Sequence, residues 1–210
     1  MGWFGSSREE EKALPERSEI PLFPLNTVLF PGGILQLKIF EQRYLDMAAL
    51  SMKEARPFGI CLIASGDEAG GVAEPHAVGT LARIVDWEMA QLGILQITTL
   101  GEQRFRIVDK AVSPDNLLRA TVELINEDGP LPFPSERRRL LPLLRRIAED
   151  MGAARIPEPH HFDDAEWVGF RITEVLPIQN LAKQKLLELE DPLSRLEILE
   201  KFLDQRKLLG

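Results

Sequence analysis

The chain has 210 residues, of which 44% are hydrophobic and 28% are charged, and its formal net charge is −8. This composition is typical of globular proteins and allows a core for one domain, or for one domain with a subdomain. The acidic excess disfavours nucleic acid as a general partner, because nucleic-acid binders present basic surfaces. The single cysteine excludes an intramolecular disulfide.

Neither a secretory signal nor a membrane span is predicted. The N-terminus is polar and charged soon after its start and lacks the apolar core of a signal peptide. No apolar run reaches the length that crosses a bilayer. We therefore expect a cytoplasmic protein without a membrane partner.

The first half of the chain predicts a flexible tail followed by short strands. Residues 1–18 are polar and without periodicity, which is typical of a tail. Leu35 and Leu37 alternate with polar residues after the turn at 31–33 and predict a strand. A helix is expected over 41–54 and a buried strand over 58–63, with Cys61 as a core residue.

Four more strands are predicted after the Gly- and acid-rich loop at 65–75. They cover residues 79–88, 93–101, 103–111 and 117–126. Gly101 is interpreted as the turn between the second and third of them. Repeated strands with one helix among them indicate a mostly antiparallel barrel or sandwich.

The last part of the chain has helical periodicity. Helices are expected from Ser135 to Gly152, over 163–175 and over 178–189, and after Asp191, which serves as the N-cap with Pro192 at the first helical position. The predicted organisation is a tail over 1–18, a β domain over 19–127 and a helical subdomain over 128–210.

Residue patterns of common enzymes are missing. The sequence has no Gly-Lys dipeptide for a phosphate-binding loop, no Gly-x-Ser-x-Gly, no His-Glu-x-x-His and no Cys-x-x-Cys. His160 and His161, beside Asp163 and Asp164, could ligate a metal or carry acid–base chemistry. The alternative is a solvated loop in which one aspartate caps the next helix. We assign no catalytic, cofactor-binding or metal-binding residue.

Five arginines cluster at the start of the helical region. In a helix, Arg137, Arg138 and Arg139 spread over about 200° and cannot form one stripe. Arg138 shares a face with Arg145, and Arg139 shares one with Arg146. Either pair could contact an acidic partner, and the alternative is a solvated outer face.

Three ordered motifs resemble the N-terminal substrate-recognition domain of Lon proteases. They are Ile20-Pro21-Leu22-Phe23-Pro24-Leu25 continuing to Phe30-Pro31-Gly32, Val78-Gly79-Thr80-Leu81-Ala82-Arg83-Ile84, and Gly101-Glu102-Gln103-Arg104-Phe105-Arg106-Ile107. The segment 186–203 also resembles the last helices of short Lon-domain proteins, so the resemblance covers roughly 19–205. It implies an α+β fold, in which a PUA-like antiparallel β pseudo-barrel precedes an all-helical subdomain.

The motif residues have structural interpretations. Prolines 21, 24 and 31 remove amide donors, which suits an irregular strand edge and a sharp turn. Gly32 and Gly33 allow positive φ in that turn. Arg104 and Phe105 should face opposite sides of a strand, the arginine solvated or hydrogen-bonded and the phenylalanine in the core.

The resemblance implies a non-enzymatic module that binds unfolded or specific protein or peptide ligands, as an adaptor or in a chaperone-like way. The ATPase and serine–lysine protease domains of complete Lon proteases do not follow in this sequence, so we expect degradation only through a partner protease system. Candidate lining residues of a peptide groove between barrel and helices are Phe23, Phe30, Leu37 and Trp87. The alternative for each is a core position, which is where apolar residues at strand period usually lie. RNA or nucleotide binding on a PUA-like fold is the alternative, and a metal-dependent enzyme is a third hypothesis.

Overall fold

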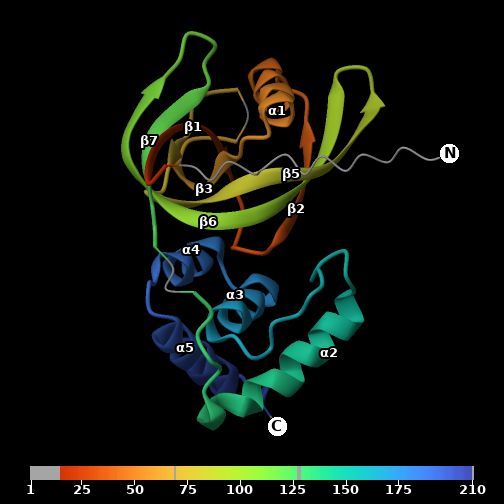
Figure 1. Cartoon of the computed structure of the whole chain (residues 1–210), viewed down its shortest axis with the longest axis vertical. Coiled ribbons are helices and arrows are strands. Elements are labelled where there is room, and N and C mark those ends of the chain that lie inside the picture. The colour runs from red at the N-terminus through yellow and green to blue at the C-terminus, as the bar shows by residue number, and fades with distance from the viewer. Residues whose placement is uncertain (1–14, 69, 127–128, 210) are drawn as a thin grey trace, which may run out of the picture.

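The computed structural model describes residues 15–68, 70–126 and 129–209. A β domain lies above a group of helices, and the chain passes from one to the other after its last strand (Figure 1). The expected tail over 1–18 and the boundary at 127–128 lie largely outside the described residues. Within them, the first strand already begins at Arg17.

Five strands close a ring in the β domain. The strands of the described residues, including two outside the ring, are β1 (Arg17–Leu25), β2 (Ile34–Ile39), β3 (Phe58–Ser65), β4 (Glu74–Pro75), β5 (Val78–Gln91), β6 (Ile94–Val112) and β7 (Leu118–Leu124). The order β1-β7-β6-β5-β3 returns to β1 through a β1–β3 pairing, so these five form a closed barrel. β2 extends the sheet beside β6, and β4 pairs with β3. All pairs are antiparallel except β1–β3.

Pro21 and Pro24 of the first motif lie in β1, the strand that closes the barrel, where the sequence had suggested an irregular strand edge, and Pro31 lies in the turn that follows. Residues from Arg17 to Pro21 pair with β7, and residues from Leu22 to Leu25 pair with β3 on the other side. A strand that changes partner midway needs fewer backbone donors at the change. Proline is therefore tolerated there although the strand is internal.

The expected turn at Gly101 is wrong. β6 runs without interruption over 19 residues, and the two strands predicted there are one. Gly101 is buried, and its amide and carbonyl bond to Gly33 and Gly32 at 2.8 and 2.7 Å. A Cβ atom at this position would overlap the carbonyl oxygen of Phe30. The glycine thus permits close approach of two chain segments, and the positive φ occurs at Gly32, where it is +70°.

Helix α1 (Gln42–Glu54) covers one opening of the barrel. Its Tyr44 ring stacks on Phe23 with centroids 4.0 Å apart, and Phe58 lies next in the same cluster. Met47 and Ala48 complete the buried face of the helix. α1 lies between two projecting hairpins, formed by β5–β6 and by β6–β7 (Figure 1).

The helical subdomain confirms the predicted order of helices. A 3-10 turn (Ser135–Leu140) leads into α2 (Leu141–Met151), followed by α3 (Ala165–Val175), α4 (Asn180–Glu188) and α5 (Pro192–Gln205). Ser135, expected as the N-cap, is instead the first residue of the 3-10 turn, and no side chain accepts a capping hydrogen bond at the start of that turn or of α2. Asp164 caps α3, and Asp191 caps α5 as predicted, each by accepting backbone amide hydrogen bonds.

Buried arginines join the barrel to the helices. Arg104 of β6 is 1% exposed, and its Nη1 donates to the carbonyls of Leu187 and Leu189 at 2.8 and 3.0 Å. Arg171 of α3 donates to Pro31 in the turn after β1, and Arg195 of α5 donates to Leu186 of α4, which ties two of the helices together. These bonds satisfy carbonyls at helix and turn ends that have no partner within their own element.

The α+β class is confirmed, with a mainly antiparallel β domain followed by helices. Arg104 is hydrogen-bonded and Phe105 fully buried, as predicted. Among the described residues, no helix combines the length and the apolar character needed to cross a membrane.

Candidate functional site

Two of the four residues predicted to line a groove lie in the core. Phe23 belongs to the cluster under α1, and Phe30 is fully buried with its ring centroid 5.8 Å from that of Phe170. Phe30 therefore fills the junction between barrel and helices, which is packed at this point by apolar side chains (Val28, Leu62, Val78, Ile125 and Leu187). The structure gives these two rings a packing role and leaves them no ligand-facing surface.

The other two predicted residues come together on the arm formed by β2, β5 and β6. Leu37 pairs with Ile97, and Ile97 pairs with Trp87, so the three form one row across three strands. Paired residues in an antiparallel sheet project to the same face. Leu37 and Trp87 also share a shallow hollow of the surface with Ile97.

Apolar and polar rows alternate along this arm. Two residues further along β2 lies the row Ile39–Leu95–Met89, which is on the same face as Leu37–Ile97–Trp87. The row between them is Lys38–Gln96–Glu88, and the row on the other side of Leu37–Ile97–Trp87 is Gln36–Thr98–Asp86; both are on the opposite face. The arm is therefore a three-stranded ribbon with one apolar and one polar face.

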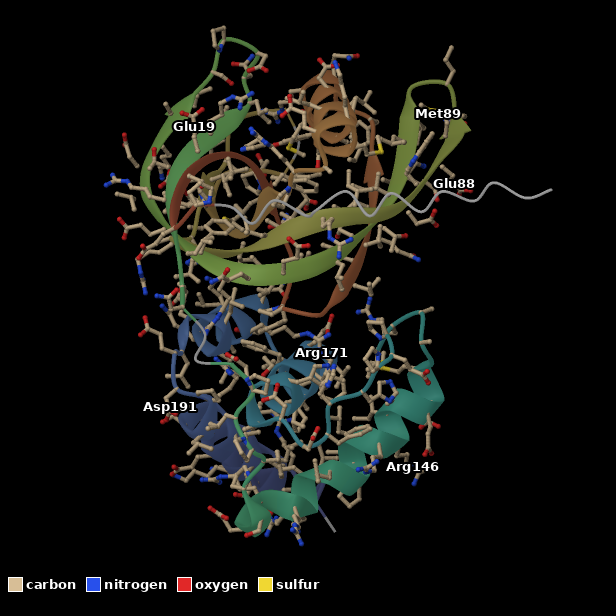
Figure 2. All side chains as sticks on the ribbon, viewed as in Figure 1. Glu19, Glu88, Met89, Arg146, Arg171 and Asp191 are labelled. Atoms are coloured by element: carbon tan, nitrogen blue, oxygen red, sulfur yellow. The ribbon has the colours of Figure 1, made fainter. Side chains whose placement is uncertain are left out.

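The apolar face runs out of the core onto the surface at β5. Ile39, Leu95 and Ile97 are buried in the cluster beneath α1, but Trp87 and Met89 in the same rows are each 56% exposed. At the hairpin tip Leu92 is 99% exposed. Figure 2 shows Met89 and Glu88 on this arm, which projects from the barrel. Exposed apolar groups in one continuous patch are typical of interaction sites.

β5 also has a free edge beside this patch. Its pairing with β3 covers only Thr80 to Ala82. Beyond that point, in the part of the chain that the structure describes, β6 is its only strand partner. The outward amides and carbonyls of residues 84–89 thus lie next to Trp87 and Met89 without a strand to bond to. Natural proteins usually shorten, charge or cover such edges.

The charges near this edge are confined to the polar face. Asp86 and Glu88 are exposed on β5, and Lys38 lies two strands away. An extended segment placed along β5 would meet apolar groups on one face and two carboxylates on the other. The arrangement can hold a strand.

The titratable groups singled out in the sequence lie elsewhere. Burial raises the pKa of the Cys61 thiol far above its ordinary value, so the thiol stays protonated in the core. His160 Nε2 lies 3.2 Å from the Ile156 carbonyl, and its ring contacts Phe162 and Trp167. His161 contacts Trp167 edge-on. Within the described ranges, no three His, Cys, Asp or Glu side chains are grouped to hold a metal ion.

Buried charge concentrates where α3 meets the Pro31 turn. Arg171 Nη1 lies 3.3 Å from Glu174 Oε2, and both side chains are almost inaccessible to solvent. Burial raises the pKa of Glu174, and Arg171 opposes the shift. Burial also lowers the pKa of Arg171. This pair fastens the Pro31 turn to α3 in the interior.

Met89 and the free edge of β5 were missed in the sequence. The strand was predicted to end at residue 88, but it continues to Gln91. The alternation of Trp87 and Met89 with Asp86 and Glu88 was the available signal. Which edge of a strand is unpaired is set by distant segments and has no local signature.

Comparisons with known proteins agree on one family. Residues 19–205 match the family described as the ATP-dependent protease La (LON) substrate-binding domain. Lon protease 2 of Herpetosiphon aurantiacus is 28% identical over 200 residues, covering 89% of this chain and 24% of that relative. The chain thus spans about a quarter of the length of that protease.

Two solved structures are similar over most of the chain. The crystal structure of a Lon N-terminal domain protein from Xanthomonas campestris has a TM-score of 0.74 and 33% identity, over 88% of this chain and 98% of that chain. The N-terminal domain of the Mycobacterium avium complex Lon protease has a TM-score of 0.62 and 19% identity, over 89% and 97%. The second likeness supports the fold alone.

Proposed function

The chain belongs to the family of ATP-dependent protease La (LON) substrate-binding domains, and from that premise we propose that it is a non-catalytic module that binds extended polypeptide segments along β5. The observation that carries the proposal is the unpaired edge of β5 beside the exposed Trp87 and Met89. Strand addition to such an edge uses backbone hydrogen bonds for affinity and side-chain contacts for selectivity.

Strand addition suits ligands that are unfolded. A folded protein has few free strands, whereas an unfolded chain can present its backbone amides and carbonyls to the edge. Apolar side chains of the ligand, which a folded protein hides, would cover Trp87 and Met89 and remove their apolar surface from water. Recognition of this kind depends on the alternation of side-chain types along the ligand more than on a defined ligand sequence.

The two faces of the arm define that pattern. Alternate side chains of an added strand lie on opposite faces. One set meets Trp87 and Met89, and the other set meets Asp86 and Glu88. Cross-strand pairs each contribute about 0.2–1 kcal/mol, and opposite charges are favoured over like charges. We therefore expect segments with alternating apolar and basic residues to bind better than segments with alternating apolar and acidic residues.

Binding of synthetic peptides to arm variants tests the proposal. The probe is a labelled eight-residue peptide of alternating Val and Lys, measured by fluorescence anisotropy with the full chain. Trp87→Ser with Met89→Ser should weaken binding by about tenfold, because two apolar contacts are lost. Val112→Ser is the matched control, since Val112 is similarly exposed at the far end of β6. Its affinity should remain that of the parent chain.

Peptides with N-methylated amides distinguish the contribution of backbone hydrogen bonds to binding from the contribution of apolar contacts. Methyl groups on the alternate amides that face β5 should abolish binding, and methyl groups on the other set should leave it intact. Equal binding of both methylated peptides would show that no strand is added. Equal affinity of the double variant and the parent chain would place the binding surface elsewhere.

The finer roles belong to the same proposal. We propose an adaptor or chaperone-like holder in the cytoplasm that delivers polypeptides to a separate protease system. RNA binding, the alternative, requires a basic surface. Of the arginines, Arg137 and Arg139 are held in ion pairs by Glu200, and Arg104, Arg171 and Arg195 are buried at the junction. These contacts support the polypeptide ligand over RNA.

A further inference from the structure

A second hollow lies on the helical subdomain, far along the chain from the β5 edge. Its apolar part is formed by Phe133, Leu141 and Phe162, all partly exposed. Its polar part is formed by Arg138, Arg145, His160 and Asp163, with Pro132 at the side. Aromatic and cationic side chains therefore meet at one surface depression.

The walls of this hollow are held in place by backbone bonds. The Phe133 amide donates to the Asp163 carbonyl at 2.7 Å, and the Ala165 amide donates to the Leu131 carbonyl at 2.7 Å. The Leu131 amide donates to Asp164 Oδ1 at 3.1 Å. Segments 131–133 and 163–165 are thus tied together although they are distant in sequence. A site fixed in this way loses little entropy when it binds a ligand.

The arginines of this region fall into two groups. Arg137 and Arg139 bind α5 through Glu200, and Arg137 also reaches Glu197. Arg138 and Arg145 line the hollow and have no ion-pair partner within the residues that the structure describes. The guanidinium carbon of Arg145 lies 4.1 Å from the centroid of the Phe162 ring, which orients it over the apolar floor. The sequence placed Arg138 and Arg145 on one face of a single helix; in the structure Arg138 lies in the 3-10 turn and Arg145 in α2, and both line this hollow.

We propose that this hollow binds an acidic peptide segment in which a carboxylate lies next to an aromatic side chain. The aromatic side chain packs on Phe133, Leu141 and Phe162, and the carboxylate accepts hydrogen bonds from Arg138 and Arg145. Guanidinium–carboxylate bonds are charge-assisted and can be bidentate. The site is independent of the β5 edge, because its residues and its preferred charge both differ.

An acidic peptide fits better than a nucleic acid. A nucleic acid carries a phosphate at every nucleotide, and its affinity grows with the number of basic contacts. The hollow provides two guanidiniums that have no ion-pair partner among the described residues, and Asp163 also lines it in a chain of net charge −8. One or two carboxylates match that charge, whereas a polyanionic backbone would extend over acidic surface.

The test uses the full chain and a capped peptide, Gly-Glu-Phe-Glu-Gly, followed by amide and arginine Nε chemical shifts. Shifts are expected at residues 131–133, 141–145 and 160–163, with weaker binding as salt is raised. Arg138→Gln with Arg145→Gln should weaken binding by about tenfold or more. Arg146→Gln is the control. Arg146 is the next residue after Arg145 on α2, its side chain is exposed (Figure 2), and it is not among the residues that line the hollow.

Each further outcome decides the proposal. The proposal is supported if binding is lost when Gln replaces both Glu residues of the peptide, and if the protein variant Trp87→Ser binds the original peptide as tightly as the parent chain does. Equal affinity of the Gln peptide, an equal effect of Arg146→Gln, or no shifts at 10 mM peptide overturns it. Tighter binding of a single-stranded oligonucleotide at the same residues would also overturn it in favour of a nucleic-acid site. Thermal melting of the double variant confirms that the exposed substitutions leave the fold intact.

Discussion

At the scale of single residues, buried polar side chains carry more of the structure than the sequence suggests. Arg104 was predicted to be solvated or hydrogen-bonded; it is buried and hydrogen-bonded, and its partners lie more than 80 residues away, at the carbonyls of Leu187 and Leu189. Local sequence indicates the strand on which the arginine lies. It contains no information about which distant carbonyls need a donor.

Arg104→Met should lower the free energy of unfolding by about 3 kcal/mol or more. Methionine keeps much of the apolar stem but removes the donor to the buried Leu187 carbonyl and the ion pair with Glu166, while the Leu189 carbonyl keeps its bond from Arg195. Arg106→Met is the matched control on the same strand. Its ion pair with Glu190 joins side chains that are 48% and 70% exposed, so its loss should cost less than about 1 kcal/mol. Urea denaturation followed by circular dichroism measures both, and equal losses would contradict this account of the junction.

Gly101→Ala should destabilise the barrel by about 1–3 kcal/mol or more. The added methyl group would overlap the carbonyl oxygen of Phe30, and backbone cannot move aside as a side chain can. Gly71→Ala adds a methyl group in open space, where no atom lies within 4 Å. Thermal melting of the two variants should separate them clearly. A Gly101→Ala chain as stable as Gly71→Ala would show that the two segments are not held so closely.

At the scale of elements, the helices were predictable and the long strand was not. Caps and 3.6-residue periodicity are local signals, and Asp191 with Pro192 marked the start of α5 correctly. In β6, the glycine at position 101 was interpreted as a turn because a glycine between apolar runs commonly is one. The structure uses it for close packing against the 30–33 turn, a contact between distant segments.

Asp191 should make the stability of α5 depend on pH. The Ser194 hydroxyl and the amides of Ser194 and Leu193 donate to its carboxylate, and these bonds hold the pKa of Asp191 below its ordinary value of 3.8. A lowered folded pKa means that the contribution is complete above 3.8 and is lost as the pH falls through the folded pKa. At pH 7, Asp191→Ala should cost about 1 kcal/mol.

The pH dependence distinguishes the charge from the cap itself. The difference between Asp191→Ala and the parent chain should shrink as the pH falls below 3.8 and through the folded pKa, because the carboxylate is protonated there. Asp191→Asn retains a capping oxygen and cannot ionise, so its stability relative to Ala should not vary with pH. Urea denaturation at pH 7 and pH 2.5 gives both comparisons. A difference that stays constant with pH would contradict a role for the charge.

At the scale of the whole molecule, the closed barrel determines which apolar residues become a surface. Phe23, Phe30, Leu37 and Trp87 are alike in a sequence that shows only alternation. Closure of β1 on β3 buries Phe23, and the helical subdomain buries Phe30. The pairing of β5 with β3 ends at Ala82, which leaves Trp87 and Met89 beside a free edge. The α+β class was therefore predictable, whereas the site required the strand order.

The central claim is that a polypeptide adds to β5 as a strand, and residue-resolved amide hydrogen exchange tests it most directly. With the alternating Val–Lys peptide in excess, the outward amides among residues 84–89 should exchange more slowly, because each gains a hydrogen bond. Protection should appear at every second residue, and amides of α2 should remain unchanged. Binding without protection on β5, or protection confined to another element, would contradict the claim.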